Sequence, residues 1–130
     1  MDTWNDTYSV GIREMDEQHK RLLAYIGALG ELLATRDDEL MHELLARITD
    51  YGREHFEAEE RLLEKHGYPL AGQRAAHEQF MEWMAETNYK AIDGTLGLPE
   101  THDYLKRWWT THILGDDMQY KEFLNSRGVS

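Results

Sequence analysis

Four histidines and one glutamate give this sequence its most specific chemical signal. His19, His55, Glu59, His77 and His112 fall on the faces of predicted helices that the hydrophobic periodicity assigns to the interior. His55 and Glu59 are four residues apart, so their side chains project from the same helix face one turn apart. Such a pair can bind one metal ion or two adjacent ions. The pattern therefore predicts a buried metal site.

Each histidine alone has a simpler explanation, a core imidazole that hydrogen-bonds a backbone carbonyl. The set favours a metal, because a buried carboxylate without a partner is costly and a bound cation removes that cost. Nitrogen and oxygen ligands suit iron, zinc, copper and manganese about equally. The chain has no cysteine, which excludes thiolate-bound zinc and iron-sulfur clusters. Of the other histidines, we expect His42 and His102 at the surface, while His66 lies on the ligand stripe at a helix end.

Length and charge limit the other functions. The 130 residues fit a single domain, 1–130, with one hydrophobic core. The net charge of -11 comes from 25 acidic and 14 basic residues that are interspersed, so we expect no nucleic-acid partner. The longest apolar stretch, Leu22 to Ala34, is too short to span a bilayer, so we expect no membrane segment. The first residues lack the features of a secretory signal, which indicates a cytoplasmic protein.

The elements that must position these ligands are predicted to be four helices. Residues 1–15 show no helical period and are expected to form an ordered arm on the core. A first helix is predicted from Asp16, as N-cap, to Thr35, and a second follows the break at residues 36–38 and ends at Gly67. A third spans 70–91, a fourth begins near Thr101, and the tail from residue 126 is expected to fray. Short loops favour an all-α, antiparallel up-down-up-down four-helix bundle with an N-terminal arm.

Five segments, in order, resemble the motifs of bacterial hemerythrins over nearly the whole chain. They are WNDTYSVGIREMDEQHKRL from Trp4 to Leu22, HFEAE from His55 to Glu59, GYP from Gly67 to Pro69, HEQF from His77 to Phe80, and WWTTHILGDD from Trp108 to Asp117. Each segment alone is weak, and together they are highly specific. The resemblance implies a single hemerythrin-like domain that binds oxygen.

The resemblance also implies a ligand set. His19 and His55 would bind one iron, which keeps an open position for dioxygen, and His77 and His112 would bind a second iron. Glu59 and Asp117 would bridge the two iron ions together with an oxo or hydroxo group. The apolar wall of the oxygen pocket would consist of Phe56, Trp108, Ile113 and Leu114.

The chain departs from the hemerythrin pattern at position 73, and at position 117 the pattern conflicts with ideal helix geometry. The family motif HxxxH would place histidine at position 73, where this chain has Gln73, with one residue fewer than usual between Pro69 and His77. The missing nitrogen could be replaced by the Gln73 amide, by a water, or by His66. Asp117 lies five residues after His112, about 140° around an ideal helix, whereas Asp116 would share the histidine's face. We follow the resemblance and choose Asp117, since Gly115 permits local distortion.

These features favour reversible dioxygen binding for storage, transport or delivery to an oxygen-consuming partner enzyme. The alternatives are a di-iron oxidase or peroxidase, and a bundle that only stores or senses iron. Di-iron oxidising enzymes of this architecture use four carboxylates with paired Glu-x-x-His motifs. The one such match, Glu39 to His42, lies off the inner stripe. A nitrogen-rich site therefore favours an oxygen-binding protein over an enzyme, with weak side oxidase or peroxidase activity still open.

Overall fold

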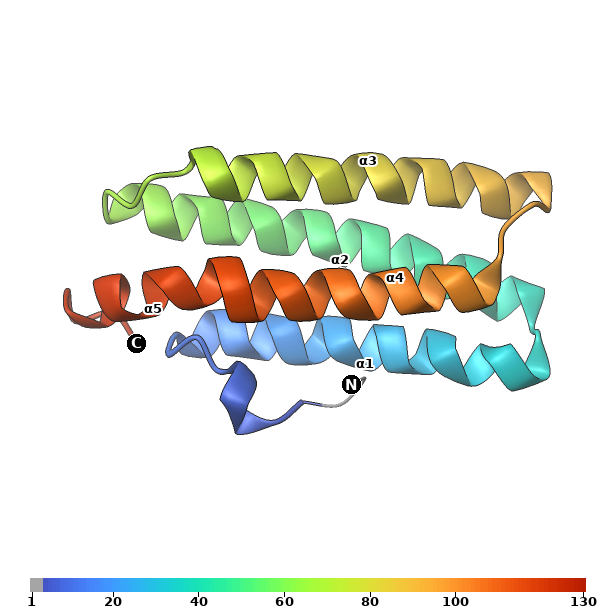
Figure 1. Ribbon diagram of the computed structural model, residues 1–130, viewed down its shortest axis with the longest axis horizontal. Helices are drawn as coiled ribbons and strands as arrows, with labels where there is room; N and C mark the ends of the chain where they lie inside the picture. Colours follow the sequence, from blue (N-terminus) through green and yellow to red (C-terminus); the bar gives the residue numbers. More distant parts are fainter. Residues whose placement is uncertain (1–3) are drawn as a thin grey trace.

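The computed structural model describes residues 4 to 130, and helices make up most of this part of the chain. The elements are the 3-10 turn η1 (Asp6–Tyr8), α1 (Arg13–Thr35), α2 (Asp38–Lys65), α3 (Ala71–Asp93), α4 (Leu98–Thr111), the π-helical turn η2 (His112–Asp117) and α5 (Met118–Asn125). The last three follow one another without a loop and form one long rod (Figure 1). Successive rods run in opposite directions, which confirms the predicted all-α four-helix bundle.

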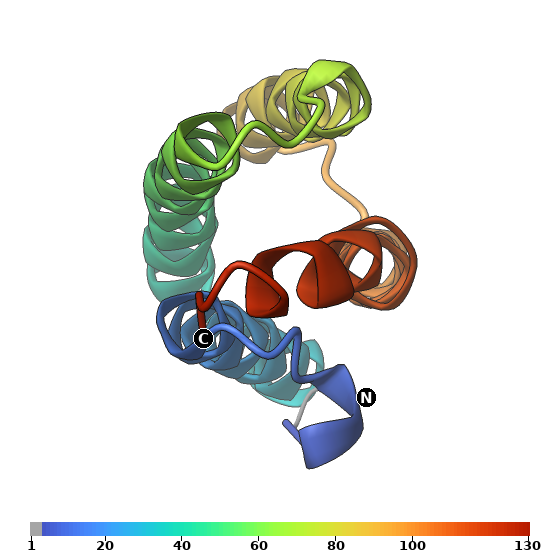
Figure 2. The same ribbon diagram turned by 90° about the vertical axis from the view of Figure 1, so that its left-hand side faces the viewer.

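The view along the bundle shows the four rods arranged around a common interior (Figure 2), and their buried hydrophobic side chains form one core there. Helix α1 packs against α2 and α4, and α2 packs against α3. Each helix contributes an apolar stripe, and the largest fully buried side chains include Trp109, Tyr120, Phe80, Met15 and Leu22. No helix within residues 4–130 combines the length and the apolar character needed to cross a membrane.

The described part of the N-terminal arm packs on the bundle, where Tyr8, Val10 and Ile12 are buried. The part of the predicted arm at residues 1–3 lies outside the described residues. Helix α1 begins at Arg13, three residues before the predicted start. The Asp16 carboxylate does not cap the helix; it accepts hydrogen bonds from the Ser9 hydroxyl at 2.6 Å and the Val10 N–H at 2.8 Å. Asp16 therefore fastens the arm to the first turn of α1.

The last rod differs from the prediction at both ends. Helix α4 begins at Leu98, so Pro99 lies in its first turn, where the missing N–H of proline costs nothing. The tail is not frayed: the Val129 N–H donates to the Leu124 carbonyl at 3.0 Å. The Asn125 amide donates to the carbonyls of Val129 at 2.8 Å and Gly11 at 3.1 Å. These bonds join the tail to the N-terminal arm.

The two histidines predicted at the surface differ. His42 is exposed, as expected, but His102 is only 9% exposed and packs on Gly30 of α1. A Cβ atom at Gly30 would lie 2.5 Å from His102 Nε2, so glycine is required for this close approach of α1 and α4. The prediction for His102 was wrong because its contact depends on a glycine on a different helix.

Candidate metal centre

Six buried side chains from all four rods meet near one end of the bundle interior. Within residues 4–130 their donor atoms converge in two groups that share Glu59, and in each group the donor atoms lie within 4.8 Å of one another. The first group contains His19, His55, Glu59 and Asp117, and the second contains Glu59, His77 and His112. All six predicted ligands therefore lie in one place, and each is at most 3% exposed.

The four imidazoles form two pairs. His19 Nε2 lies 3.2 Å from His55 Nε2, and His77 Nε2 lies 3.2 Å from His112 Nε2. Each pair joins a histidine from one helix to a histidine from a neighbouring rod, so the bundle must be folded before either pair exists. Two adjacent sites, each with two imidazole nitrogens, follow from this arrangement.

Both carboxylates reach both imidazole pairs. Asp117 places Oδ2 at 3.3 Å from His19 Nε2 and Oδ1 at 3.2 Å from His112 Nε2. Glu59 places Oε2 at 3.7 Å from His55 Nε2 and Oε1 at 3.0 Å from His77 Nε2. One oxygen of each carboxylate thus faces each pair, which is the arrangement needed to bridge two cations.

The π-helical turn η2 explains why Asp117, and not Asp116, faces the interior. A π-helix bonds residue i to residue i+5, so its wider turn brings the side chains of His112 and Asp117 to the same face. Asp116 lies at the edge of this face, where its Oδ2 accepts a hydrogen bond from His112 Nδ1 at 2.8 Å. The local distortion allowed by Gly115 is therefore present in the fold.

Three polar residues contact the Nδ1 atoms of the imidazoles, on the side away from the centre. The predicted ligand set did not include these residues. The Nδ1–H groups of His55, His77 and His112 face Gln18 Oε1 at 2.5 Å, Glu60 Oε2 at 2.8 Å and Asp116 Oδ2 at 2.8 Å. An acceptor at Nδ1 fixes the tautomer that turns the Nε2 lone pair inward, as metal-bound histidines require. Each of the three directly adjoins a predicted ligand in the sequence, and that adjacency is the signal that could have identified them.

Tyr120 supports the centre from α5. Its hydroxyl donates a hydrogen bond to Glu59 Oε2 at 2.7 Å, and the side chain is fully buried. Burial, together with the negative charge of Glu59, raises the pKa of Tyr120 well above its usual value, so the hydroxyl keeps the proton that it donates. Nothing in the spacing of the predicted ligands pointed to Tyr120.

The donor set fits a pair of cations and is costly without them. Glu59 Oε1 and Asp117 Oδ2 are buried and have no hydrogen-bond donor among residues 4–130. Glu59 Oε1 lies 3.0 Å from His77 Nε2, but the Nδ1 proton of His77 is directed to Glu60, so two lone pairs face each other. A cation between such atoms removes both the repulsion and the cost of the buried charge.

The pKa values of the buried groups reflect the same unfavourable electrostatic contacts. Burial lowers the pKa of His55 to about 3, so this imidazole is neutral and ready to bind a metal. Burial also acts to lower the pKa of His112, but the carboxylates of Asp117 and Glu59 outweigh it and raise that pKa to about 9. Burial and the charge of Glu59 raise the pKa of Asp117. Without metal, a proton on His112 therefore offsets part of the negative charge of the two carboxylates.

Position 73 faces the centre despite the shortened segment before it. Gln73 is 4% exposed, and its Nε2 donates a hydrogen bond to Asp117 Oδ1 at 3.0 Å. The amide therefore binds a candidate ligand and leaves its own Oε1 buried, with no hydrogen-bond partner in the described part of the chain. His66, the other possible ligand, is the C-cap of α2, is half-buried and belongs to neither group of donors.

Aromatic rings, among them the predicted wall residues Phe56 and Trp108, lie against the imidazoles. Phe56 stacks on His77 at 3.9 Å, and Trp108 stacks on His112 at 4.6 Å, so both lie against the second pair. Trp109, which the prediction omitted, is fully buried. Its ring centroid lies 6.5 Å from that of His19 and 5.8 Å from that of His55.

The other two predicted wall residues differ in burial. Ile113 is buried, whereas Leu114 is 42% exposed, because the turn that directs His112 and Asp117 inward directs residues 114–116 outward. The place of Leu114 in the pocket wall therefore stays a prediction.

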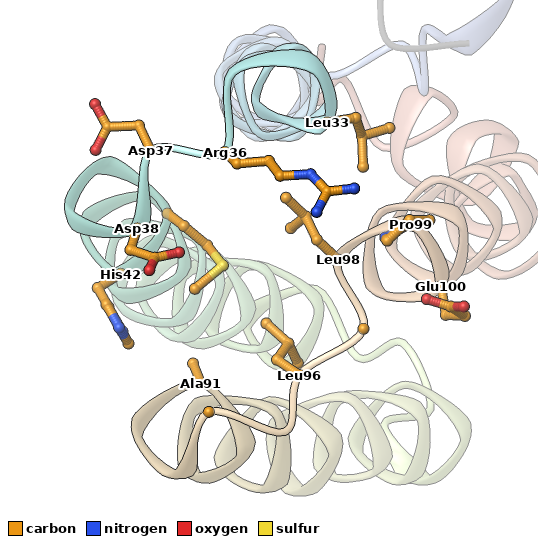
Figure 3. A pocket seen from close by; sticks show the side chains of 13 residues that line it. Leu33, Arg36, Asp37, Asp38, His42, Ala91, Leu96, Leu98, Pro99 and Glu100 are labelled. Atoms are coloured by element: carbon orange, nitrogen blue, oxygen red, sulfur yellow. The ribbon is translucent and has the colours of Figure 1, made fainter.

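A separate cavity of about 500 Å³ lies at the opposite end of the bundle, between the α1–α2 and α3–α4 connections (Figures 1 and 3). Arg36 extends from the first connection toward Leu98, while Asp37 points away from the opening (Figure 3). None of the six candidate ligands lines this cavity. The chemistry described above is therefore confined to the metal centre.

Comparisons with known proteins agree with this geometry. Residues 10–124 match the family described as "Hemerythrin HHE cation binding domain". A bacteriohemerythrin of Stenotrophomonas maltophilia is 32% identical over 120 residues, which cover 92% of this chain and 78% of that protein. A hemerythrin-like protein of Naegleria gruberi is 34% identical over 125 residues, covering 93% and 92%. The crystal structure of a wild-type hemerythrin superposes with a TM-score of 0.86 at 25% identity, covering 92% of this chain and 95% of the other. The chain belongs to the hemerythrin family.

Proposed function

We propose that this protein holds two iron ions and binds dioxygen reversibly, for storage, transport or delivery to an oxygen-consuming enzyme. One iron would be held by His19 and His55 and the other by His77 and His112, with Glu59 and Asp117 bridging them. The observation that carries the proposal is that each carboxylate directs one oxygen to each imidazole pair. Two ferrous ions held there would supply the electrons needed for dioxygen to bind reversibly.

The chain's own residues favour reversible binding over oxidation of a second substrate. Four imidazoles and two carboxylates surround the centre, whereas di-iron enzymes in related bundles use a carboxylate-rich set. Trp109 and Phe56 are buried, and their rings lie beside His55 of the first pair. An apolar surround on this side would shield a bound oxygen molecule from the protons that would turn it over.

The test is an absorption spectrum of the ferrous protein under argon, under air and after evacuation. The proposal expects a new visible band in air that vanishes under vacuum and returns with air over several cycles. His55→Ala should lose the band, whereas His42→Ala, an exposed histidine on the same helix, should keep it. A band that never reverses would instead support an oxidase, and no band with full iron content would support storage or sensing of iron.

A further inference from the structure

A small cavity opens beside the second imidazole pair. Its volume is about 340 Å³, and it is lined by Tyr68, Pro69, Gly72, Gln73, Asp116 and Gln119. Three of these residues contact the ligands or their supports: Gln73 bonds Asp117, Asp116 bonds His112, and Tyr68 packs on Tyr120 with ring centroids 6.1 Å apart. The cavity therefore adjoins the ligands of the second imidazole pair and the residues that support them.

Among the described residues that line this cavity, only Gln73 has a buried side-chain polar atom without a hydrogen-bond partner. Its Nε2 donates a hydrogen bond to Asp117 Oδ1 at 3.0 Å, so the amide nitrogen faces Asp117. Oε1 is thus left as a buried acceptor that still requires a donor. An unsatisfied buried acceptor in a native fold indicates a water or a ligand.

The two imidazole pairs differ in their surroundings. Aromatic rings lie against both pairs, so the difference between the pairs lies in the polar residues beside them. The second pair has Gln73 next to Asp117 Oδ1, which is itself 3.2 Å from His112 Nε2. Gln73 offers no imidazole nitrogen, and its amide bonds Asp117, so the metal beside His77 and His112 would keep a position for a small ligand.

From this arrangement we infer that the cavity beside Gln73 admits a small hydroxylic ligand, with water as its simplest member, to the metal held by His77 and His112. The ligand would donate one hydrogen bond to Gln73 Oε1 and contact the polar groups of Asp116 and Gln119 at the cavity wall. A buried water commonly needs two to four such partners. This inference rests on the proposed metal centre and adds to it a second, solvent-exchanging position.

Gly72 makes the inference testable without touching the centre. It lies on the cavity wall, and a Cβ atom added there meets nothing within 4 Å, so a large side chain can fill the opening. Gly72→Phe should therefore block the cavity and keep both Gln73 and all six ligands. Ala75→Phe is the matched control, because Ala75 is exposed on the same helix and does not line the cavity.

The experiment is water-proton relaxation of the full chain loaded with manganese(II), which relaxes the protons of waters that exchange at the metal. We expect Gly72→Phe to lose the contribution of one exchanging water per chain, and Ala75→Phe to match the natural protein. Gln73→His, which offers an imidazole in place of the water, should show the same loss as Gly72→Phe.

Equal relaxation in the natural protein, Gly72→Phe and Gln73→His would overturn the inference, as would an equal loss in Ala75→Phe. Should Gly72→Phe fail to fold, Gln73→His alone decides between the two results. Failure of the natural protein to retain iron as well as manganese would contradict the metal centre itself and the inference with it. Retained manganese with unchanged relaxation would contradict only the inference.

Discussion

Removal of one hydroxyl group, in Tyr120→Phe, is predicted to weaken metal binding and stability together. The Tyr120 hydroxyl donates to Glu59 Oε2 at 2.7 Å, and both side chains are fully buried. Burial acts to raise the pKa of Glu59, but His55 and the other imidazoles lower it well below its usual value, so Glu59 is ionised. The substitution therefore removes a hydrogen bond to a buried charge and leaves the ring packing intact.

A hydrogen bond of this kind contributes about 1.5 to 3 kcal/mol. With an unfolding entropy of about 2.1 cal/mol/K per residue, the 130 residues give about 0.27 kcal/mol/K, so a loss of about 2 kcal/mol lowers Tm by about 7 °C. Loss of a residue that orients a metal ligand typically costs about 10- to 100-fold in metal affinity. Both effects should appear in the same variant.

The assays are thermal unfolding of the metal-free protein by circular dichroism and competition of the loaded protein with a chelator. Tyr104→Phe is the control, because Tyr104 is a half-buried ring stacked on Trp83 and its hydroxyl contacts none of the ligands. A Tm and metal affinity in Tyr120→Phe equal to those of Tyr104→Phe would refute the role given to the Tyr120 hydroxyl.

Three further predictions concern other parts of the centre. Glu60→Gln should lower metal affinity by about 10- to 100-fold in chelator competition, because His77 loses a charged acceptor at Nδ1, while exposed Glu57→Gln should not. Apparent metal affinity should rise with pH and level off near pH 9. The pKa of His112 is raised to about 9, so below that pH this imidazole holds a proton that the metal must displace. An affinity that is flat from pH 6.5 to 9 would contradict this competition. Leu114→Ala should cost less than about 1 kcal/mol in chemical denaturation, below the range of about 2 to 5 kcal/mol for a buried leucine, because the side chain is 42% exposed.

The helices and the imidazole positions could be predicted because both depend on local periodicity. A residue that repeats at three- and four-residue steps with leucine and isoleucine lies on the inner face of its helix, whatever that helix packs against. His19, His55, Glu59 and His77 follow this rule, and all four are buried in the centre.

Asp117 could not be placed by the same rule. An ideal helix turns it away from His112, and only the π-helical turn, which depends on the packing of the whole rod, brings both inward. The family resemblance indicated Asp117, whereas ideal helix geometry favoured Asp116. The same turn leaves Leu114 42% exposed, which its spacing did not predict.

The supporting residues depend on contacts between helices, which periodicity does not report. Gln18 on α1 serves His55 on α2, and Glu60 on α2 serves His77 on α3. Each lies beside a ligand in sequence and so about 100° around the helix from it, at the edge of the inner face. Which histidine such a residue supports is decided by the neighbouring helix. The contacts of Tyr120 and of His102 with other helices have the same origin.

The most direct test of the central claim is the stoichiometry of dioxygen uptake per iron and per chain. Two adjacent cations bridged by Glu59 and Asp117 should act as one binding unit, so the ferrous protein should contain two iron ions and take up one dioxygen per chain. Evacuation should release that dioxygen and leave both iron ions bound and ferrous. One iron per chain, or uptake that consumes dioxygen without releasing it under vacuum, would contradict the account.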